Sequence, residues 1–393
     1  MEIINRYNHI LEVPSSQIMT KNYPLGGIFE FNQAKILSRS GYKIGIISLN
    51  LDSLRFLFSR NVKMSYKIID GVPIFRLNKK IFHIIRFGRH KKYILKSVLS
   101  SYEKLFNSYV TIYGKPDILH AHDLNYGGFY SNHIYNKYDI PYILTWHSST
   151  IYNEYDYRTS NFELEKSVLK NARIVIAVSK AVSKFLKKRF GLTNVYESFN
   201  VLEPAFEFCS EKIKIQKNIA FTFISIGSLD ENKNHKLLIS AFSRSMKHKN
   251  CNLKIIGTGK LFDELNDLVD KLEMNKQIEF LGFCNRDEVI NNLITSNCLV
   301  LSSKYETFGV VLIEALSLGL PVISTKCGGA EDIVNAENGI LVNTDCTEEM
   351  EDAIKFMTKN IDKYDPQILR ENVIKRFGIN SFINDFTNIL EQC

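Results

Sequence analysis

Cysteine pairs, long apolar runs and an export signal are all missing from this chain of 393 residues. Its seven cysteines lie after residue 208, and no two of them form a C-x-x-C pair. This scatter argues against a zinc site or a disulfide framework and is typical of a reducing compartment. No apolar run reaches the roughly 18 residues that a membrane span needs, and the first residues lack a basic segment followed by an apolar core. We therefore expect a cytoplasmic protein.

Charge is distributed unevenly along the chain. Lys and Arg exceed Asp and Glu over residues 1–204, whereas acidic residues are in excess in the remainder. No nucleic-acid-binding motif accompanies the basic half, so we expect a membrane headgroup or a phosphorylated acceptor as its anionic partner, and no nucleic acid. The stretch from Lys79 to Lys96 interleaves cations with Ile, Phe and Tyr. It suits either a helix or arm on an anionic membrane surface or a solvated helix with one face on a sheet.

Short apolar runs alternate with helical patterns throughout, which predicts an α/β protein with parallel sheets and crossover helices. A stretch without periodicity, residues 200–210, separates two such series, so we predict two Rossmann-like domains with a cleft between them. In open sheets of this kind, ligands lie beyond the carboxyl ends of the strands. The strands are expected at 9–13, 43–49, 116–120, 142–145 and 173–178, and then at 220–226, 253–256, 278–281, 298–301 and 321–324.

Two glutamates flank a glycine turn in the segment YETFGVVLIEALSLGLPVISTKCGG. A helix is predicted directly after Gly309, over 310–318, because apolar residues recur at helical spacing and Gly-Leu-Pro follows. The start of such a helix has unpaired N–H groups and a positive dipole end, which suit a diphosphate. Glu314, on this helix, can accept hydrogen bonds from the vicinal hydroxyls of a ribose. Glu306, in the turn, can reach the next part of the same ligand.

The pattern E-x-F-G-x4-E followed by G-x-P-V-I-x-T-x-x-G-G resembles the retaining glycosyltransferases of the GT-B type, specifically glycosyltransferase family four. The resemblance covers nearly the whole chain and is strongest over 220–335. It implies two Rossmann-like domains that face each other across a cleft. Residues 1–205 would form the acceptor-side domain and residues 206–379 the donor-binding domain. A final helix at about 380–393 would pack back on the first domain.

Further motifs of the second half match the donor site of that family. In FISIGSLDENKNH, Gly227, Leu229 and Lys233 match, whereas Ser228 stands where an arginine is usual and offers no bidentate charged contact. Lys233 is expected to meet the charge that grows on the leaving diphosphate; the alternative is a solvated loop lysine. The donor-binding residues that the resemblance implies in this half are Gly227, Ser228, Lys233, Gly257, Gly259, Phe283, Glu306, Thr307, Phe308, Gly309, Val310, Val311 and Glu314.

The first half contributes two candidate segments. Gly26 and Gly27 open a predicted helix and allow its N-terminus to approach the diphosphate, although an ordinary loop is the alternative. In PDILHAHD, alternation places His120 and His122 on one face, and at most one of them is expected to be buried. The family has a cleft histidine at the second position, so we predict that His122 faces the donor sugar and His120 points into packing. The segment TWHSS places Trp146 and His147 on the acceptor side.

The resemblance implies a metal-independent retaining glycosyltransferase with His122, Lys233 and Glu306 as catalytic residues. It would move a sugar from a nucleotide-sugar donor to a glycan or lipid-linked acceptor in bacterial surface polysaccharide biosynthesis. A UDP-sugar is expected as the donor in preference to a GDP-sugar. No cofactor or metal is expected, because no D-x-D motif is present and Lys233 with helix dipoles would replace the metal. A peripheral position at the inner membrane face is also expected. The alternatives are a nucleotide-sugar epimerase and a nucleotide-sugar-binding protein without turnover.

Overall fold

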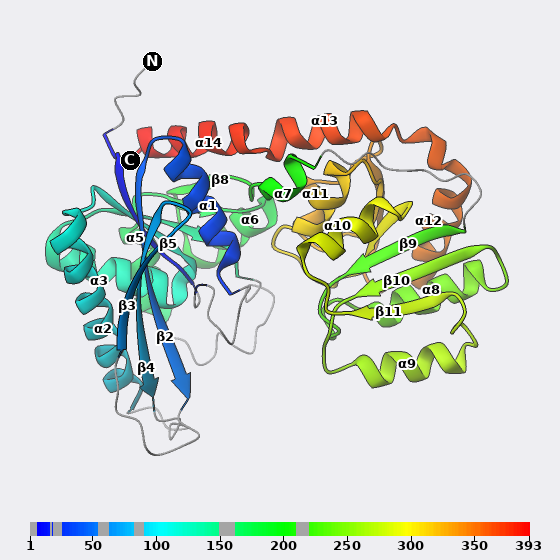
Figure 1. Cartoon of the computed structure of the whole chain (residues 1–393), viewed down its shortest axis with the longest axis horizontal. Coiled ribbons are helices and arrows are strands. Elements are labelled where there is room, and N and C mark those ends of the chain that lie inside the picture. Colours follow the sequence, from blue (N-terminus) through cyan, green and yellow to red (C-terminus); the bar gives the residue numbers. More distant parts are fainter. Residues whose placement is uncertain are drawn as a thin grey trace. The chain divides into compact units, whose positions relative to one another are not determined.

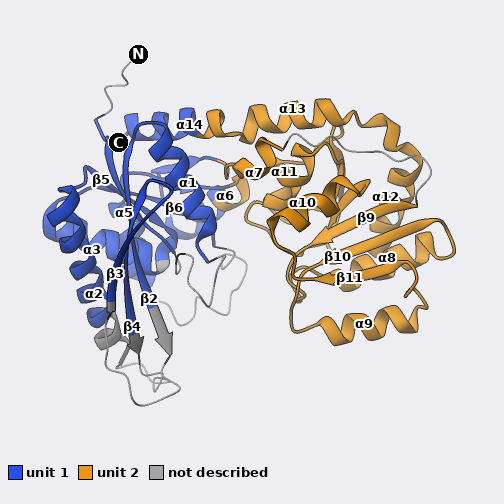
Figure 2. Ribbon diagram, in the orientation of Figure 1, with its two compact units in different colours: residues 1–178, 183–198, 383–393 blue, residues 179–182, 199–382 orange. Residues whose placement is uncertain are grey.

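The structure, a computed structural model, describes residues 6–15, 18, 26–53, 63–81, 90–148, 162–209 and 220–393. The chain forms two compact units (Figure 2). The first comprises Met1–Val178, Ser183–Ser198 and Ile383–Cys393, and the second comprises Ser179–Val182 and Phe199–Phe382. Each unit is an α/β structure on its own sheet (Figure 1).

The first unit is built on an eight-stranded sheet in the order β3-β4-β2-β1-β5-β6-β7-β8. All neighbouring strands are parallel except β3 and β4, which form an antiparallel hairpin. The strand order reverses at β1, which lies between β2 and β5, so the carboxyl ends of β1 and β5 flank a switch point. The strands are β1 (His9–Val13), β2 (Lys43–Ser53), β3 (Lys63–Ile69), β4 (Val72–Ile81), β5 (Ile118–His122), β6 (Tyr142–Trp146), β7 (Val175–Ala177) and β8 (Val195–Glu197).

The helices of this unit follow the crossover pattern of parallel sheets. The first begins after Gly27, in the left-handed region at φ 61°, and ends before Gly41, at φ +100°. A π-helical turn, η1 (Asp123–Gly128), follows β5 directly. The helices are α1 (Ile28–Arg39), α2 (His90–Tyr113), α3 (Phe129–Tyr138), α5 (Phe162–Asn171) and α6 (Lys180–Phe190), the last of which starts in the second unit.

The second unit has a six-stranded parallel sheet in the order β11-β10-β9-β12-β13-β14. Its strand order reverses at β9, so the loops after β9, β10 and β12 share one edge. The strands are β9 (Phe221–Ile226), β10 (Cys251–Ile256), β11 (Ile278–Gly282), β12 (Cys298–Leu301), β13 (Val322–Thr325) and β14 (Gly339–Val342). The helices are α7 (Pro204–Glu207), α8 (His235–Met246), α9 (Phe262–Lys271), α10 (Arg286–Ile294), α11 (Val310–Ser317), η3 (Ala330–Asp332), α12 (Thr347–Asn360), η4 (Ile361–Lys363), α13 (Pro366–Phe377) and α14 (Ile379–Glu391).

The last residues of α14 belong to the first unit. The Tyr42 hydroxyl and Thr387 Oγ1 are hydrogen-bonded at 2.9 Å, and the Tyr196 hydroxyl donates to Asp385 Oδ1 at 3.0 Å. Ser198 donates a further hydrogen bond to the Asp385 carboxylate. Two segments of the first unit, one at Tyr42 and one at Tyr196 and Ser198, thus hold the end of the chain.

The α/β class with two parallel-sheet units is confirmed, but three local predictions need correction. The β3–β4 hairpin, β8 and β14 were not predicted. The stretch predicted as an aperiodic linker contains α7. In the basic stretch from Lys79 to Lys96, Lys79 and Lys80 lie at the end of strand β4 rather than on a helix or arm. Helix α2 begins only at His90, and residues 82–89 lie outside the described residues.

Candidate functional site

Two loops of the second unit are bound to each other at the carboxyl edge of its sheet. The loop after β12 reaches the loop after β9 through Lys304, whose N–H donates to Asn232 O at 2.7 Å. The Asn232 side chain donates to Tyr305 O at 3.0 Å and accepts from Tyr305 N at 3.1 Å. Ser302 Oγ donates to Lys233 O at 2.8 Å. These bonds fix two of the segments that the sequence assigned to a donor site.

Lys233 and Glu306, one from each loop, form an ion pair. Lys233 Nζ lies 2.5 Å from Glu306 Oε1, and the Ser303 hydroxyl donates to the same oxygen at 2.6 Å. The two side chains are 22% and 15% exposed, so the pair is reachable from solvent but partly shielded. The Glu306 backbone is held as well, since its N–H donates to Cys327 O at 2.7 Å and its carbonyl accepts from Gly329 N at 2.8 Å. The Lys233 ammonium group is therefore held in a fixed position at the carboxyl edge of the second sheet.

The predicted glycines allow these loops to pack closely. A Cβ on Gly257, whose φ is +145°, would lie 1.9 Å from Gly227 O. A Cβ on Gly259 would lie 2.3 Å from Leu229 O, and one on Gly227 would lie 3.1 Å from Lys233 Cδ. Backbone bonds join the same loops, because Leu229 N donates to Thr258 O at 3.0 Å. Gly227, Gly257 and Gly259 thus bring the loops after β9 and β10 together.

Helix α11 begins at this edge with a glycine in the left-handed region. Gly309 has φ 96° and ψ 57°, and no side chain caps the helix. Phe308 anchors the turn, with 1% exposure and ring centroids 6.0 Å from Phe199 and 5.7 Å from Phe377. Thr307, Val310 and Val311 are half-buried. Since the first N–H groups of a helix have no carbonyl partner in the preceding turn, this end of α11 can receive an anionic group.

Glu314 lies one turn further along α11 and is buried, with 4% of the residue exposed. Burial raises the pKa of Glu314 to about 7, and the Arg286 guanidinium works against this rise. Arg286 Nη1 lies 2.9 Å from Glu314 Oε1, and Arg286 Nη2 lies 2.5 Å from Glu203 Oε2. Neither Arg286 nor Glu203 was predicted. Neither residue belongs to a recognisable sequence motif, and only the fold brings the two side chains to Glu314.

Ser228 and Phe283 occupy the rim of the same edge. The Ser228 hydroxyl donates to Asp230 Oδ2 at 2.6 Å, so its hydrogen is already used within the loop. Asp230 also accepts from Lys233 N at 3.0 Å. Burial alone would raise the pKa of Asp230, but these hydrogen bonds lower it. Phe283 follows β11 and is 64% exposed, which leaves its ring free to stack on a flat ligand.

In the first unit, Glu12, His120 and His122 form a buried cluster at the switch point between β1 and β5. Glu12 Oε2 lies 2.9 Å from His120 Nδ1 and 2.9 Å from His122 Nε2. The exposed fractions are 0%, 1% and 0%, so the expectation that at most one histidine is buried is wrong. The physical reason is Glu12, an unpredicted carboxylate that gives both imidazoles a partner.

Electrostatics in this cluster favour an ionised Glu12. Burial would raise the pKa of Glu12, but His120 and His122 lower it to about 2. Burial lowers the pKa of His120, whereas for His122 the hydrogen bond and charge of Glu12 outweigh burial and raise the pKa. One ligand atom of each residue lies within 4.8 Å of the others, so these three residues have the donor set of a metal site. The catalytic role of His122 stays a prediction.

The neighbouring residues of the first unit complete this network. His122 Nδ1 and His147 Nε2 are hydrogen-bonded at 3.1 Å. Asp123 Oδ1 accepts from His147 N at 2.7 Å and from Ser148 N at 2.8 Å, and burial raises the pKa of Asp123 to about 6. Trp146 is 2% exposed and donates from Nε1 to Ser148 O at 3.0 Å. Trp146 is therefore a core residue, contrary to the expectation that it lines an acceptor surface.

Gly26 and Gly27 lie directly before α1, and both are half-buried. Residues 19–25 of the predicted glycine loop lie outside the described residues. The first turn of α1 already holds a carboxylate, because Glu30 is 7% exposed and accepts from Ser15 Oγ at 2.7 Å. This negative charge weakens the attraction of the helix N-terminus for a diphosphate.

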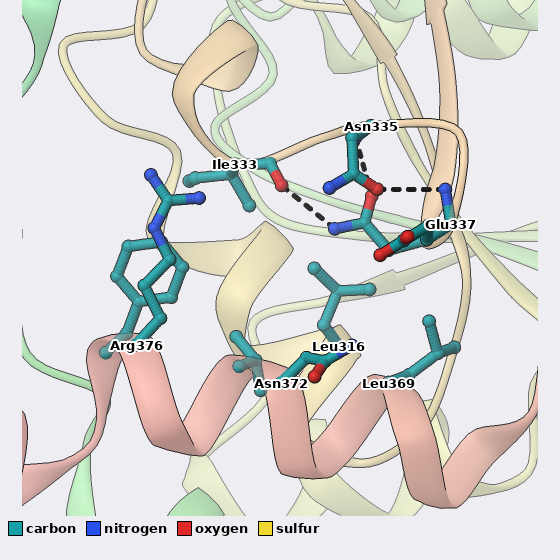
Figure 3. Close-up of a pocket in the computed structure, with 10 residues that line it drawn as sticks. Leu316, Ile333, Asn335, Glu337, Leu369, Asn372 and Arg376 are labelled. Atoms are coloured by element: carbon teal, nitrogen blue, oxygen red, sulfur yellow. Dashed lines mark hydrogen bonds between the residues drawn. The ribbon is translucent and has the colours of Figure 1, made fainter.

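A separate cavity of about 170 Å³ lies in the second unit. It is bounded by Leu316 of α11, the segment after η3, and α13 with Arg376 (Figure 3). Asn338 Nδ2 donates to Ile333 O at 2.9 Å, and Glu337 N donates to Asn335 Oδ1 at 2.9 Å. None of the predicted site residues lines this cavity.

The two α/β units have the GT-B fold, which solved glycosyltransferase structures share. Residues 210–376 match the family model described as "Glycosyl transferases group 1", and residues 32–196 match "Glycosyltransferase Family 4". The chain belongs to the glycosyltransferases of this family 4 and group 1 type. No helix in the described part of the chain has the length and apolar character to cross a membrane.

Individual relatives agree with this assignment. The chain is 26% identical over 329 residues to the uncharacterized glycosyltransferase MJ1607 of Methanocaldococcus jannaschii, covering 79% of this chain and 78% of that protein. It is 23% identical over 346 residues to the putative teichuronic acid biosynthesis glycosyltransferase TuaC of Bacillus subtilis, covering 84% of each. Another curated relative is matched over only 42% of its length. The structure of Anabaena Alr3699/HepE in complex with UDP is similar at TM-score 0.72 and 15% identity, covering 98% of this chain and 100% of that one.

Proposed function

We propose that this glycosyltransferase moves a sugar from a nucleotide-sugar donor to a glycan or lipid-linked acceptor, with retention of configuration and without a metal ion. The observation that carries the proposal is the Lys233–Glu306 ion pair of 2.5 Å beside the start of α11. It combines a cation for a leaving diphosphate, a carboxylate for sugar hydroxyls and a helix N-terminus within one short stretch of the edge.

The donor would lie along this edge in four parts: ribose, diphosphate, sugar and base. The ribose would bind to Glu314, because a carboxylate accepts hydrogen bonds from two vicinal hydroxyls. The diphosphate would lie at the backbone of 308–311, where the dipole of α11 favours negative charge. Glu306 would hold sugar hydroxyls, and the exposed ring of Phe283 would pack on the base. UDP is the nucleotide in complex with the similar Anabaena protein, which supports a UDP-sugar here.

Chemistry at such a site requires stabilisation of the leaving group. As the bond between the anomeric carbon and the phosphate oxygen breaks, both electrons go to the diphosphate, and Lys233 Nζ meets this growing charge. The acceptor hydroxyl attacks the face from which the diphosphate departs, and its proton passes to a leaving phosphate oxygen. Attack on that face retains the configuration. Lys233 lowers the barrier only as far as it binds the transition state more tightly than the donor.

The first unit would bind the acceptor and support catalysis through His122. Its buried Glu12–His122 pair can hold one protonation state of the imidazole, as a positioned acid or base requires. The excess of Lys and Arg over residues 1–204 suits a phosphorylated or lipid-linked acceptor at the inner face of a membrane. The similarity to TuaC, a putative teichuronic acid biosynthesis enzyme, supports a role in surface polysaccharide assembly.

A nucleotide-release assay tests the proposal. The protein is incubated with UDP-, GDP-, ADP- and TDP-linked sugars, with and without lipid-linked and glycan acceptors. Acceptor-dependent release of one nucleotide is expected. Interconversion of the sugar without acceptor would instead identify an epimerase, and binding without release or interconversion would identify a binding protein.

Membrane association has its own test, because it is independent of the chemistry. Flotation with anionic phosphatidylglycerol vesicles should carry the protein at low salt, and about 0.5 M salt should release it, since exposed charges are screened within a few ångströms. Absence from the vesicle fraction at low salt would contradict the membrane proposal and leave the transfer reaction untouched.

A further inference from the structure

Three charged side chains from three separate segments of the second unit form a row of alternating charge. Glu203 lies directly before α7, Arg286 is the first residue of α10, and Glu314 lies on α11. Arg286 Nη2 is 2.5 Å from Glu203 Oε2, and Arg286 Nη1 is 2.9 Å from Glu314 Oε1. One guanidinium therefore binds two carboxylates through separate nitrogens, which fixes the direction of both.

Arg286 is held in place from its backbone to its guanidinium. The start of α10 is a capping box, in which Glu288 N donates to Asn285 Oδ1 at 3.0 Å and Asn285 N donates to Glu288 Oε2 at 2.7 Å. The guanidinium lies over the ring of Phe206, 5.1 Å from its centroid. A cap, a ring and a second carboxylate thus restrict the orientation in which Arg286 meets Glu314.

The charge state of Glu314 depends on its neighbours because its side chain is only 5% exposed. Burial raises the pKa of Glu314 to about 7; the Arg286 charge opposes this and the Glu203 charge adds to it. Arg370, on α13, is directed elsewhere, since its guanidinium donates to the backbone carbonyls of Phe206, Glu207 and Ser317. Arg286 is therefore the cation that favours the carboxylate form.

We propose that Arg286 is a positioning residue of the nucleotide site, which binds Oε1 of Glu314 so that the ionised carboxylate presents Oε2 to the vicinal hydroxyls of the nucleoside ribose. Glu203 does not contact the ribose, but it positions Arg286 by binding Nη2 of the guanidinium. This inference rests on the proposed function, because it assigns the ribose of the donor to Glu314. Arg286 itself does not contact the donor.

The test measures UDP affinity of the full chain by calorimetry between pH 6 and pH 9 for the wild type, Arg286→Ala and Arg286→Lys. Without the guanidinium, the pKa of Glu314 rises further, so Arg286→Ala should bind UDP about tenfold more weakly at pH 7. The loss should shrink towards pH 9, where the carboxylate ionises even without its partner. Arg286→Lys keeps the charge and should recover most of the affinity. Arg244→Ala, which removes an exposed pair with Glu348 at 3.3 Å, is the matched control and should bind as the wild type does.

Each contrary outcome has a distinct meaning. Unchanged affinity in Arg286→Ala, or a loss that is equal at every pH, overturns the inference, because a merely structural role would not move the pH profile. If Arg286→Ala does not fold, Glu203→Gln decides: loss of the Glu203 charge lowers the pKa of Glu314, so the pH profile of UDP binding should shift towards lower pH. An unshifted profile overturns the inference. A wild-type protein that binds no nucleotide overturns the proposed function itself, and the inference with it.

Discussion

Lys233 and Glu306 are 73 residues apart in the sequence, and their charged atoms meet at 2.5 Å. The contact joins the loop after β9 to the loop after β12 at the point where the strand order of the second sheet reverses. A switch point of this kind leaves a crevice beyond the carboxyl ends of the strands, where ligands bind in open α/β sheets. The pair therefore places a cation and a carboxylate at the sheet edge where open α/β folds bind their ligands.

Replacement of Lys233 by alanine should lower turnover far more than stability. Loss of a charge that stabilises a transition state typically costs about 100-fold or more in rate, whereas a partly exposed ion pair contributes about 1 kcal/mol or less to folding. Turnover at saturating donor and a thermal melt measure both quantities. Lys236→Ala is the control, because Lys236 is 67% exposed and pairs with Glu264 at 3.3 Å. Turnover near the wild-type value in Lys233→Ala would assign the leaving-group charge to another residue.

Replacement of Glu314 by alanine should weaken nucleotide binding. A charge-assisted hydrogen bond is typically worth about 1.5–3 kcal/mol, so the expected loss is about ten- to hundredfold. Calorimetric titration with UDP gives the affinity directly. Glu264→Ala, which removes an exposed carboxylate from α9 of the same unit, should bind UDP with unchanged affinity. Equal affinity in Glu314→Ala and the wild type would remove Glu314 from the ribose site.

Acid should destabilise the first unit through Glu12. The pKa of Glu12 is about 2 in the folded protein, against an ordinary value of 4.5. A lowered folded pKa contributes stability that is fully present above the unfolded pKa and is lost as pH falls through the folded one. The contribution of about 3 kcal/mol should therefore disappear between about pH 4.5 and pH 2. Urea unfolding over this range should show a smaller acid loss in Glu12→Gln, and an equal slope in both proteins would contradict the assignment.

Gly257 should tolerate no side chain. A Cβ there would lie 1.9 Å from Gly227 O at a φ of +145°, so Gly257→Ala should cost more than about 3 kcal/mol of unfolding free energy. Gly41 is the matched control, because its φ is +100° but no atom lies within 4 Å of its Cβ position. Gly41→Ala should cost about 1 kcal/mol, for backbone strain alone. Similar losses in the two variants, measured by chemical unfolding, would contradict the close approach.

The elements that could be predicted from the sequence are those marked by local signals, such as turn glycines and helix ends. The helix predicted over 310–318 is α11, because Gly309 permits the left-handed turn that opens it and Gly319 with Pro321 ends it. The β3–β4 hairpin was missed, although Asp70-Gly71 is a turn signal, and both residues have positive φ. The hairpin interrupts an otherwise parallel pattern, and alternating strands and crossover helices do not predict it.

Partners far apart in the sequence could not be predicted. Glu12 and His120 are separated by 108 residues, and nothing near Glu12 indicates that parallel pairing of β1 with β5 brings it to two imidazoles. Arg286 likewise lacks a motif of its own, and only the packing of α10 against the start of α7 brings it between Glu203 and Glu314. Both the Glu12–histidine network and the Arg286–glutamate network depend on buried charged side chains. Hydrophobic periodicity predicts which apolar residues are buried, but it does not predict the burial of a single charged residue.

The anomeric configuration of the product tests the account most directly. With the donor and acceptor found by nucleotide release, the reaction is followed by proton NMR in the presence of EDTA, and the coupling constant of the new anomeric proton is read before any later equilibration. Transfer should continue in EDTA, and the product should have the anomeric configuration of the donor sugar. An inverted product, or transfer that EDTA abolishes and a divalent cation restores, would contradict the proposed mechanism.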